Sequence, residues 1–213
     1  FTFPQTDDAY VVIDALDNGS YVKIIPGENK IMGYTTKNSG GVPDNFRNYF
    51  IAEFDKPFTY TASVADGKIS TSSLEAKCNH AGAIIGFKTK KGEIVNARVA
   101  SSFISFEQAE LNLRREIGQD NFDTIEQKGR DRWNDILGRI DVEDNDLDRL
   151  RTFYSCMYRS VLFPMSFYEI DAEGKPVHYS PFNGKVLPGY MFTGTGFWDT
   201  FRCLFPFLNL MYP

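Results

Sequence analysis

The chain has 213 residues, of which 42% are hydrophobic and 24% charged, a composition that is typical of a globular protein with a sizeable buried core. The 23 Lys and Arg and the 28 Asp and Glu give a net charge of −5, and the basic residues form no stripe or run, so no nucleic-acid partner is predicted. No apolar stretch approaches the length of a membrane span.

The first 105 residues have the pattern of a β-sheet protein. Short runs of β-branched and aromatic residues alternate with turn signals made of Gly, Pro, Asn and Asp, and no helical period lies between them. The expected strands are residues 10–14, 21–25, 48–54, 58–64, 83–88 and 93–103, the last two joined as a hairpin through residues 90–92. Strands of this length and spacing predict an antiparallel sandwich.

The pattern changes at Ser105. The segment Ser105-Phe-Glu-Gln108 has the form of a capping box, in which the serine hydroxyl and the glutamine side chain bond to free backbone N–H groups at a helix start. Apolar residues then recur at helical spacing up to Ile117. We therefore predict two regions, a β-sandwich segment over residues 1–105 and a mainly helical region over residues 106–213.

Two further helices are expected in the second region. The first spans about residues 123–136 and begins with Asp123 as its cap. The second spans residues 147–161, where apolar side chains recur at i+3 and i+4, and Pro164 lies just past its end. These periodic patterns predict helices that each bury one face.

A β-hairpin and a last helix complete the expected elements. Residues 166–170 and 176–179 are expected to pair around the turn at residues 171–174. A stretch rich in Gly and Pro over residues 183–196 then leads into a helix that starts near Trp198.

The cysteines and histidines predict neither a metal site nor a disulfide framework. Cys78, Cys156 and Cys203 are odd in number and far apart, so neither a disulfide framework nor a zinc site is expected. Cys156 and Cys203 lie in apolar helical patterns and are expected to be buried thiols. The two histidines, His80 and His178, are isolated in the sequence, which favours surface or packing roles.

The densest candidate site is the segment Gly194-Thr-Gly-Phe-Trp-Asp-Thr-Phe-Arg202. Its two glycines allow the backbone to turn tightly and to approach a ligand closely. Trp198 offers a flat apolar face to a sugar ring, and Asp199 can accept charge-assisted hydrogen bonds from hydroxyl groups. Arg202, one turn later, can pair with Asp199 or reach another hydroxyl. A purely structural interpretation stays open, in which Asp199 caps the helix and Trp198 packs into the core.

Four segments, in order along the chain, carry a family resemblance. They are residues 105–113, 133–140, 152–158 and 194–213. Together they resemble glycoside hydrolase family 92, the exo-acting, calcium-dependent α-mannosidases. The resemblance implies an α+β fold, with the later part of an N-terminal β-sandwich over residues 1–105, followed by linker helices and the start of an (α/α)6 catalytic barrel over residues 106–213. Family proteins are several times longer, so the chain is expected to be an internal fragment.

The resemblance also implies an activity and a substrate pocket. The whole protein is expected to hydrolyse terminal α-linked mannose, α-1,2-linked in particular, with inversion. Trp198 and Asp199 would lie in the pocket for the terminal mannose. Arg202 matches the motif and is taken as a third substrate-binding residue, with a structural role as the alternative.

The catalytic acid, the catalytic base and the calcium ligands are expected outside the chain. No catalytic or metal-binding residue is therefore assigned within it, and the fragment alone is expected to be inactive. The acids at positions 169, 171 and 173 are expected to be solvated turn residues.

The expected partners are mannose-containing glycans and either the remainder of the chain or a second copy, because the last helix is apolar on more than one face. The expected location is secreted, periplasmic or at the surface of a bacterium. Two rival hypotheses remain: a non-catalytic carbohydrate-binding β-sandwich protein with a helical extension, and a helical scaffold in which the Trp-Asp segment only packs. A downstream continuation with acidic loops would favour the enzyme.

Overall fold

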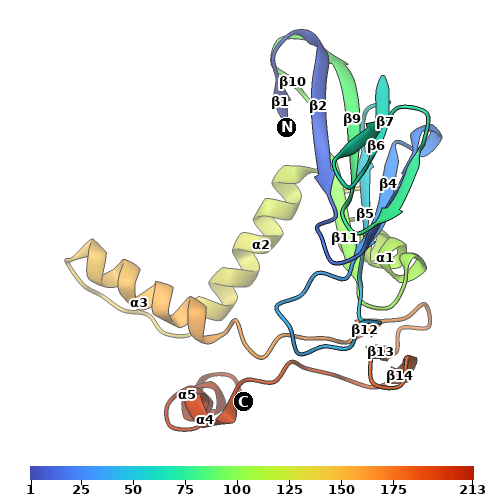
Figure 1. Cartoon of the computed structure of the whole chain (residues 1–213). Helices are drawn as coiled ribbons and strands as arrows, with labels where there is room; N and C mark the ends of the chain where they lie inside the picture. Colours follow the sequence, from blue (N-terminus) through green and yellow to red (C-terminus); the bar gives the residue numbers. More distant parts are fainter. The chain divides into compact units, whose positions relative to one another are not determined.

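The structure is a computed structural model that describes all 213 residues. The chain divides into two compact units (Figure 1), the first made of residues 1–119 and 169–189 and the second of residues 120–168 and 190–213. The chain therefore returns to the first unit after the first helices of the second. The domain boundary expected after residue 105 stays a prediction.

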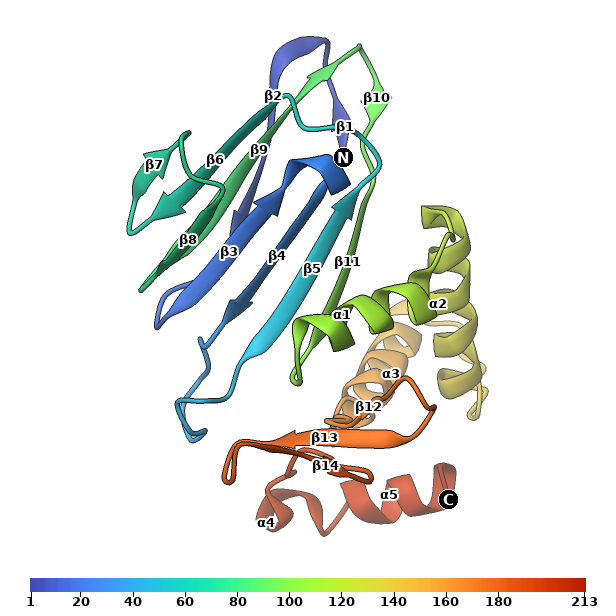
Figure 2. The ribbon, with the colours of Figure 1, turned by 90° about the vertical axis from the view of Figure 1, so that its right-hand side faces the viewer.

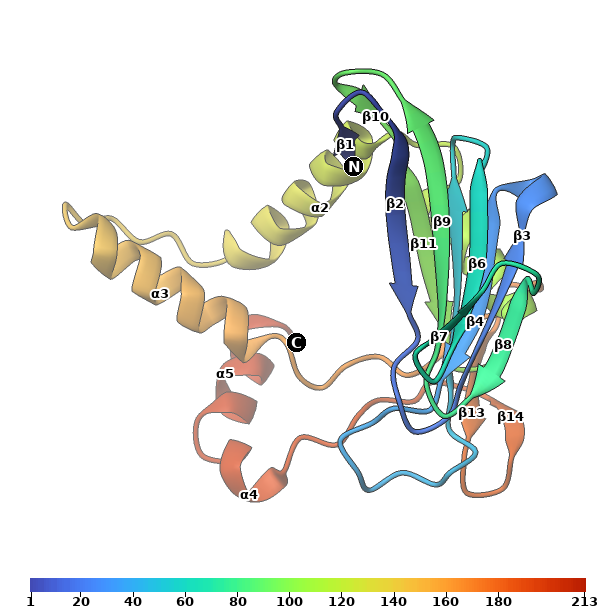
Figure 3. The same cartoon turned by 45° about the horizontal axis from the view of Figure 1, so that its top comes forward.

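The first unit is built on two antiparallel sheets, which Figure 3 shows one behind the other. The strand orders are β11-β5-β4-β3-β8 and β2-β9-β6-β7, and β1 pairs with β10 at one end. The bounds are β1 (Thr2–Phe3), β2 (Thr6–Asp14), β3 (Ser20–Ile25), the 3-10 turn η1 (Pro26–Glu28), β4 (Lys30–Thr35), β5 (Asn48–Phe54), β6 (Tyr60–Ala65), β7 (Lys68–Ser70), β8 (Glu75–Cys78), β9 (Ala81–Thr89), β10 (Glu93–Ile94) and β11 (Ala97–Ser102). The predicted antiparallel sandwich is confirmed.

Alternate residues of the two sheets form one core. Val22 and Ile24 of β3 belong to the same buried cluster as Ile85 and Phe87 of β9, and each is at most 1% exposed. Burying a side chain of this kind contributes roughly 1.5–3 kcal/mol. The rings around Phe87 are those of Phe3, Phe54 and Phe58. Four of the 19 phenylalanines therefore pack together in this core.

The predicted hairpin between residues 83–88 and 93–103 is wrong. A turn does form at Lys90, but β9 pairs with β2 and β6, whereas β11 pairs with β5 in the other sheet. The predicted strand 93–103 is interrupted at Val95 and Asn96, where Val95 is fully buried in the core. The chain crosses from one sheet to the other at this point, so the two runs cannot pair with each other.

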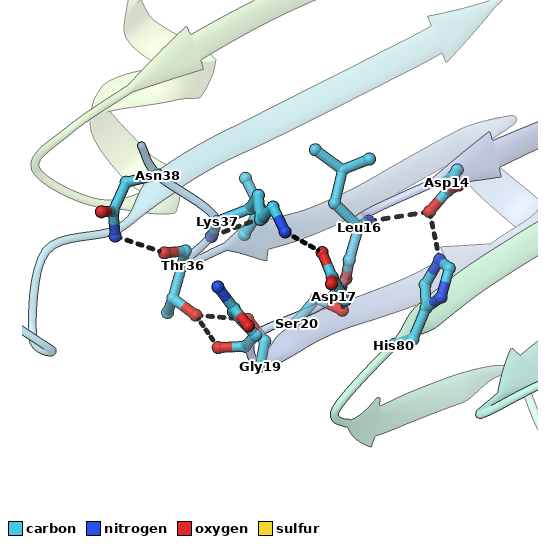
Figure 4. Close-up of polar contacts among 11 residues, drawn as sticks. Asp14, Leu16, Asp17, Gly19, Ser20, Thr36, Lys37, Asn38 and His80 are labelled. Carbon is cyan, nitrogen blue, oxygen red and sulfur yellow. Dashed lines mark hydrogen bonds and ion pairs between the residues drawn. The ribbon is translucent and has the colours of Figure 1, made fainter. Parts of the chain in front are cut away.

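Polar contacts tie the loops at one end of the sandwich (Figure 4). Asp14 Oδ1 lies 2.6 Å from His80 Nε2 and accepts a hydrogen bond from Leu16 N, and Asp17 pairs with Lys37 at 2.6 Å. The hydrogen bond from Leu16, followed by that with His80, holds the pKa of Asp14 below its ordinary value. His80 is exposed and has a surface role, as expected.

A helix covers the outer face of the five-stranded sheet (Figure 2). It consists of α1 (Phe106–Asn112) and the π-helical turn η2 (Leu113–Ile117), with Ala109 and Leu113 fully buried against Ile51 of β5. Ser105 caps it as predicted, because its hydroxyl accepts from Gln108 N at 3.2 Å. The second half of the predicted capping box is wrong, since the Gln108 side chain bonds to more distant groups.

A small three-stranded sheet from later in the chain belongs to the first unit. Its strands are β12 (Glu169–Ile170), β13 (Pro176–Ser180) and β14 (Lys185–Pro188), in the order β12-β13-β14. The predicted hairpin around residues 171–174 is confirmed, although it is shorter than expected, because Ser166 pairs with Phe192 instead. β14 was not predicted.

The second unit is helical. Its helices are α2 (Phe122–Leu137), α3 (Leu147–Ser160), α4 (Phe197–Thr200) and α5 (Leu204–Met211). The helices predicted over residues 123–136 and 147–161 are confirmed. The two helices contact each other through the rings of Trp133 and Tyr158, whose centroids lie 4.6 Å apart. The predicted cap of α2 is wrong, since Asn121 accepts from Thr124 N at 2.9 Å and Asp123 follows within the first turn. None of these helices has both the length and the apolar character to cross a membrane.

The expected burial of two cysteines is also wrong. Cys156 of α3 and Cys203, just before α5, are both exposed. The reason is that these helices bury little within this chain: α3 buries only Met157, and α5 buries no residue. The apolar positions of both helices are at helical spacing as predicted, but apart from Met157 the other elements of this chain cover them at most partly.

Candidate functional site

The candidate segment forms the start of α4 in the second unit. Gly196 is the N-cap residue and adopts the left-handed conformation, with φ +54°, which costs a non-glycine residue about 1–2 kcal/mol. A Cβ atom at this position would lie 3.5 Å from Asp199 Oδ2. Asp199 N donates to Gly196 O at 2.9 Å and closes the first turn. The left-handed backbone of Gly196 therefore sets the direction in which α4, with Trp198 and Asp199 in its first turn, begins.

The Trp198 ring is 86% exposed, and α4 buries no residue. The structural alternative, in which Trp198 packs into the core of this chain, is therefore wrong. A flat aromatic face that is open on this scale can stack on the apolar face of a ligand ring.

The Asp199 side chain is exposed in the first turn of α4. The helix has no side-chain cap bond, so the capping role considered for Asp199 is not observed. The carboxylate keeps its acceptor positions open, and an ionised acceptor forms stronger hydrogen bonds than a neutral one.

Arg202 does not pair with Asp199. Its guanidinium group lies over the Phe201 ring, 5.2 Å from the ring centroid. Of the two roles left open for Arg202, the salt bridge with Asp199 is therefore not formed here, and the exposed guanidinium remains able to donate to a ligand hydroxyl.

Two extended segments pair antiparallel just before Gly194 in the chain. Thr193 N donates to Met165 O at 2.9 Å, Met165 N donates to Thr193 Oγ1 at 2.8 Å, and Ser166 forms a bridge with Phe192. The backbone that leads into the candidate segment is therefore fixed within the second unit.

Sequence reasoning missed the role of Glu169. It is not a solvated turn acid: it is partly buried, and its two oxygens accept from Phe103 N and Asn112 Nδ2, each at 2.7 Å. Asp171 accepts from Lys175 N at 2.8 Å within the turn, and Glu173 is exposed there, so both are turn residues as expected. The signal for Glu169 lay in polar residues of the first helix rather than in the hairpin itself.

The residues of this chain do not fit a calcium site. No three His, Cys, Asp or Glu side chains gather closely enough to hold a metal ion. No step of the chemistry is therefore assigned to calcium through residues of this chain.

Family models match the chain along almost its whole length. Residues 1–102 match the glycosyl hydrolase family 92 N-terminal domain, and residues 108–213 match the family 92 catalytic domain. The chain belongs to glycosyl hydrolase family 92. The α+β fold, a sandwich segment followed by the start of a helical catalytic domain, agrees with the fold that the resemblance implied.

Solved family 92 enzymes are similar over the full chain. A family 92 inverting mannosidase of Bacteroides thetaiotaomicron is 44% identical over 97% of this chain, with a TM-score of 0.92. A family 92 α-mannosidase of the same bacterium is 28% identical over 98% of the chain, with a TM-score of 0.85. This chain spans 28% and 29% of the lengths of those two structures.

A curated relative is described as an uncharacterized secreted glycosidase of Arthroderma benhamiae. It is 34% identical over 77 residues, which are 34% of this chain and 10% of the relative. The family 92 chain therefore corresponds to only a part of each of these proteins.

Proposed function

We propose that this chain is part of an inverting exo-α-mannosidase that hydrolyses terminal α-linked mannose, α-1,2-linked in particular, from glycans. The observation that carries the proposal is the 44% identity, over 97% of the chain, with a family 92 inverting mannosidase. Family membership supports a glycosidase in general. The inversion, the exo-action and the α-1,2 linkage go beyond what family membership supports and are proposed here.

Within this chain, Trp198 and Asp199 are proposed to line the pocket for the terminal mannose, with Arg202 beside them. The exposed ring suits the C–H face of the sugar, and the unpaired carboxylate suits its hydroxyl groups. Arg202 would donate to a further hydroxyl.

Inversion needs two carboxyl groups about 6.5–9.5 Å apart, one to protonate the leaving oxygen and one to activate water across the ring. We place both, together with the calcium ligands, in the part of the enzyme beyond this chain, so the fragment alone would be inactive. A secreted, periplasmic or cell-surface location in a bacterium is part of the proposal, and the secreted relative supports the secretion alone.

The test of the pocket is Asp199→Asn in the full-length enzyme. Loss of an ionised acceptor for a sugar hydroxyl should lower kcat/KM for an α-mannoside about 10- to 100-fold, with the thermal midpoint unchanged. Asp123→Asn is the matched control, because Asp123 also lies exposed in the first turn of a helix.

Unchanged kinetics of Asp199→Asn would contradict the pocket assignment. A wild-type protein that binds mannose-containing glycans without hydrolysing them would instead support the non-catalytic carbohydrate-binding alternative.

A further inference from the structure

The four-stranded sheet of the first unit has an unpaired edge. In the order β2-β9-β6-β7, β2 is a terminal strand, and no strand of this chain pairs with its far side (Figure 3). Ala15 N donates to Ala81 O at 3.1 Å, in the register of the ladder between β2 and β9. Successive residues of an antiparallel ladder alternate in direction, so the N–H and C=O groups of Tyr10 and Val12 point away from β9. The far edge of β2 therefore offers free backbone groups to a further strand.

The five-stranded sheet has an uncovered core position. Ile31 of β4, Ala52 of β5 and Val99 of β11 are neighbours in one row across this sheet. Ile31 and Ala52 belong to the core between the two sheets and are at most 1% exposed, so Val99 is on the core face as well. Val99 is nevertheless 55% exposed. Ser101, on the same face two residues later, is also exposed.

The order of the strands explains this exposure. At one end of the five-stranded sheet, β8 and β3 contact β6 and β9 of the other sheet. β2 follows β9, so it lies over the middle of the five-stranded sheet, and β11 extends beyond it. One more strand beside β2 would lie over β11. Such a strand would use the free edge of β2 and cover Val99 at the same time.

The chemistry of this edge fits an extended polypeptide. Main-chain pairing along a sheet edge requires a second backbone that presents N–H and C=O groups at the spacing of a strand. Charged residues, prolines and bulges usually block such pairing. The bulge between Thr6 and Ala9 lies at the start of β2, whereas Tyr10 and Val12 in its middle carry no such protection. Side chains of the added strand that face Val99 must be apolar.

A second copy of this chain fits the edge poorly. In the antiparallel register that places Tyr10 beside Val12 of a symmetric copy, Asp8 would lie opposite Asp14 at both ends of the pairing. Like charges directly opposite each other destabilise a sheet. The rest of the enzyme is a better source, because a solved family 92 structure matches 97% of this chain with a TM-score of 0.92 and this chain spans only 28% of it.

We propose that a β-strand from the part of the enzyme outside these 213 residues pairs with the free edge of β2 and completes the core over Val99. Its backbone bonds to the outward N–H and C=O groups of Tyr10 and Val12. The proposal rests on family membership and on the geometry of the sandwich, and not on the proposed activity.

Amide hydrogen exchange of the full-length enzyme, resolved to single residues, tests the pairing. Val11 and Ile13 turn their N–H groups toward β9, so they are controls within the same strand. We expect the amides of Tyr10 and Val12 to exchange as slowly as those of Val11 and Ile13, within about tenfold. A larger difference, with Tyr10 and Val12 the faster pair, would show a free edge and overturn the proposal.

Val99→Asp tests whether the same strand covers the core. A carboxylate is costly to bury, so this variant should speed the exchange of Tyr10 and Val12 by about tenfold or more. Ile69→Asp is the matched control, because Ile69 is 62% exposed and lies on β7, at the other end of the four-stranded sheet. The control should leave the exchange of Tyr10 and Val12 unchanged. A Val99→Asp enzyme with wild-type exchange at both residues would refute the covering of Val99; if this variant fails to fold, the wild-type measurement still decides the pairing.

Analytical ultracentrifugation under the same conditions identifies the source of the strand. Slow exchange of Tyr10 and Val12 in a monomeric enzyme supports a strand from the same polypeptide. Slow exchange that is found only in a dimer and is lost when the enzyme is diluted to a monomer would assign the edge to a second copy and overturn the proposal.

Discussion

Glu53 of β5 connects the sandwich to the helix that covers it. Arg114 Nη1 donates to Glu53 Oε2 at 2.9 Å, and Lys30 Nζ lies 3.5 Å from Glu53 Oε1. Glu110 contacts Arg114 at 2.6 Å and Lys30 at 3.1 Å. Burial alone would raise the pKa of Glu53, but the hydrogen bond and charge of Arg114, together with Lys30, outweigh it and hold the pKa below its usual value.

The pH dependence of this contribution follows from the lowered pKa. The ionised Glu53 stabilises the fold at neutral pH, and its contribution is lost as the pH falls through the folded-state pKa. Glu53→Gln should therefore lower the free energy of unfolding by about 1–3 kcal/mol at pH 7. The deficit should shrink in acid, below the ordinary glutamate pKa of about 4.3. Urea unfolding of the wild type and the variant, at pH 7 and at a pH below the glutamate pKa, measures this deficit in the full-length enzyme.

The control for Glu53 is Glu126→Gln on α2. Glu126 pairs with Arg130 at 2.6 Å, but both side chains are at least half exposed. Such a surface pair contributes only about 0.3–0.5 kcal/mol. Equal losses in the two variants, or a Glu53→Gln deficit that grows in acid, would contradict this account.

At the residue scale, the sequence predicted the candidate segment but not the side-chain contacts of Arg202 and Glu169. Residue types alone indicated that Trp198 and Asp199 could bind a sugar, and their exposure leaves them available. The Arg202–Asp199 pair could not be excluded from spacing, because rotamers decide it. The partners of Glu169 lie 57 and 66 residues away, and no local pattern in the hairpin indicates them. The signal that the sequence did contain is the recurrence of Gln108, Asn112 and Arg115 at i, i+4 and i+7 on the first helix.

At the scale of elements, periodicity predicted the two long helices α2 and α3 well, although the N-cap of α2 is Asn121 and not the predicted Asp123. β4 was missed because it contains Gly33, which normally weakens a strand. The structure requires that glycine, since a Cβ would lie 2.3 Å from Tyr21 O and 2.5 Å from Phe50 Cζ. The predicted pairing of residues 83–88 with residues 93–103 was wrong for a different reason. A turn at Lys90 predicts that the strands on either side of it are neighbours. The chain instead crosses to the other sheet at Val95, and this crossing depends on the core of the whole sandwich.

At the scale of the whole molecule, the second unit exposes large apolar side chains. Apart from Trp198, which is proposed to face the sugar, Phe197 is 71% exposed and Leu210 78%. Large exposed apolar patches usually mark an interface. Because the family 92 structures are several times longer than this chain, we propose that the remainder of the enzyme covers these side chains.

The isolated 213-residue chain should therefore self-associate or bind the separately produced remainder of the enzyme. Analytical ultracentrifugation with a hydrophobic dye tests this, and Leu210→Asp should weaken the association because it places a charge in the apolar surface. A monodisperse wild-type monomer at high concentration that binds no dye would count against the prediction.

We propose that the whole enzyme inverts the anomeric centre of the α-linked mannose that it releases. The most direct measurement is proton NMR of the full-length enzyme during the first minutes of hydrolysis of the methyl glycoside of an α-1,2-linked mannobiose, before the released mannose mutarotates. Attack of water on the face opposite the leaving group predicts that β-mannose appears first and α-mannose grows in later. α-Mannose as the first product, or no release of mannose at all, would contradict the account.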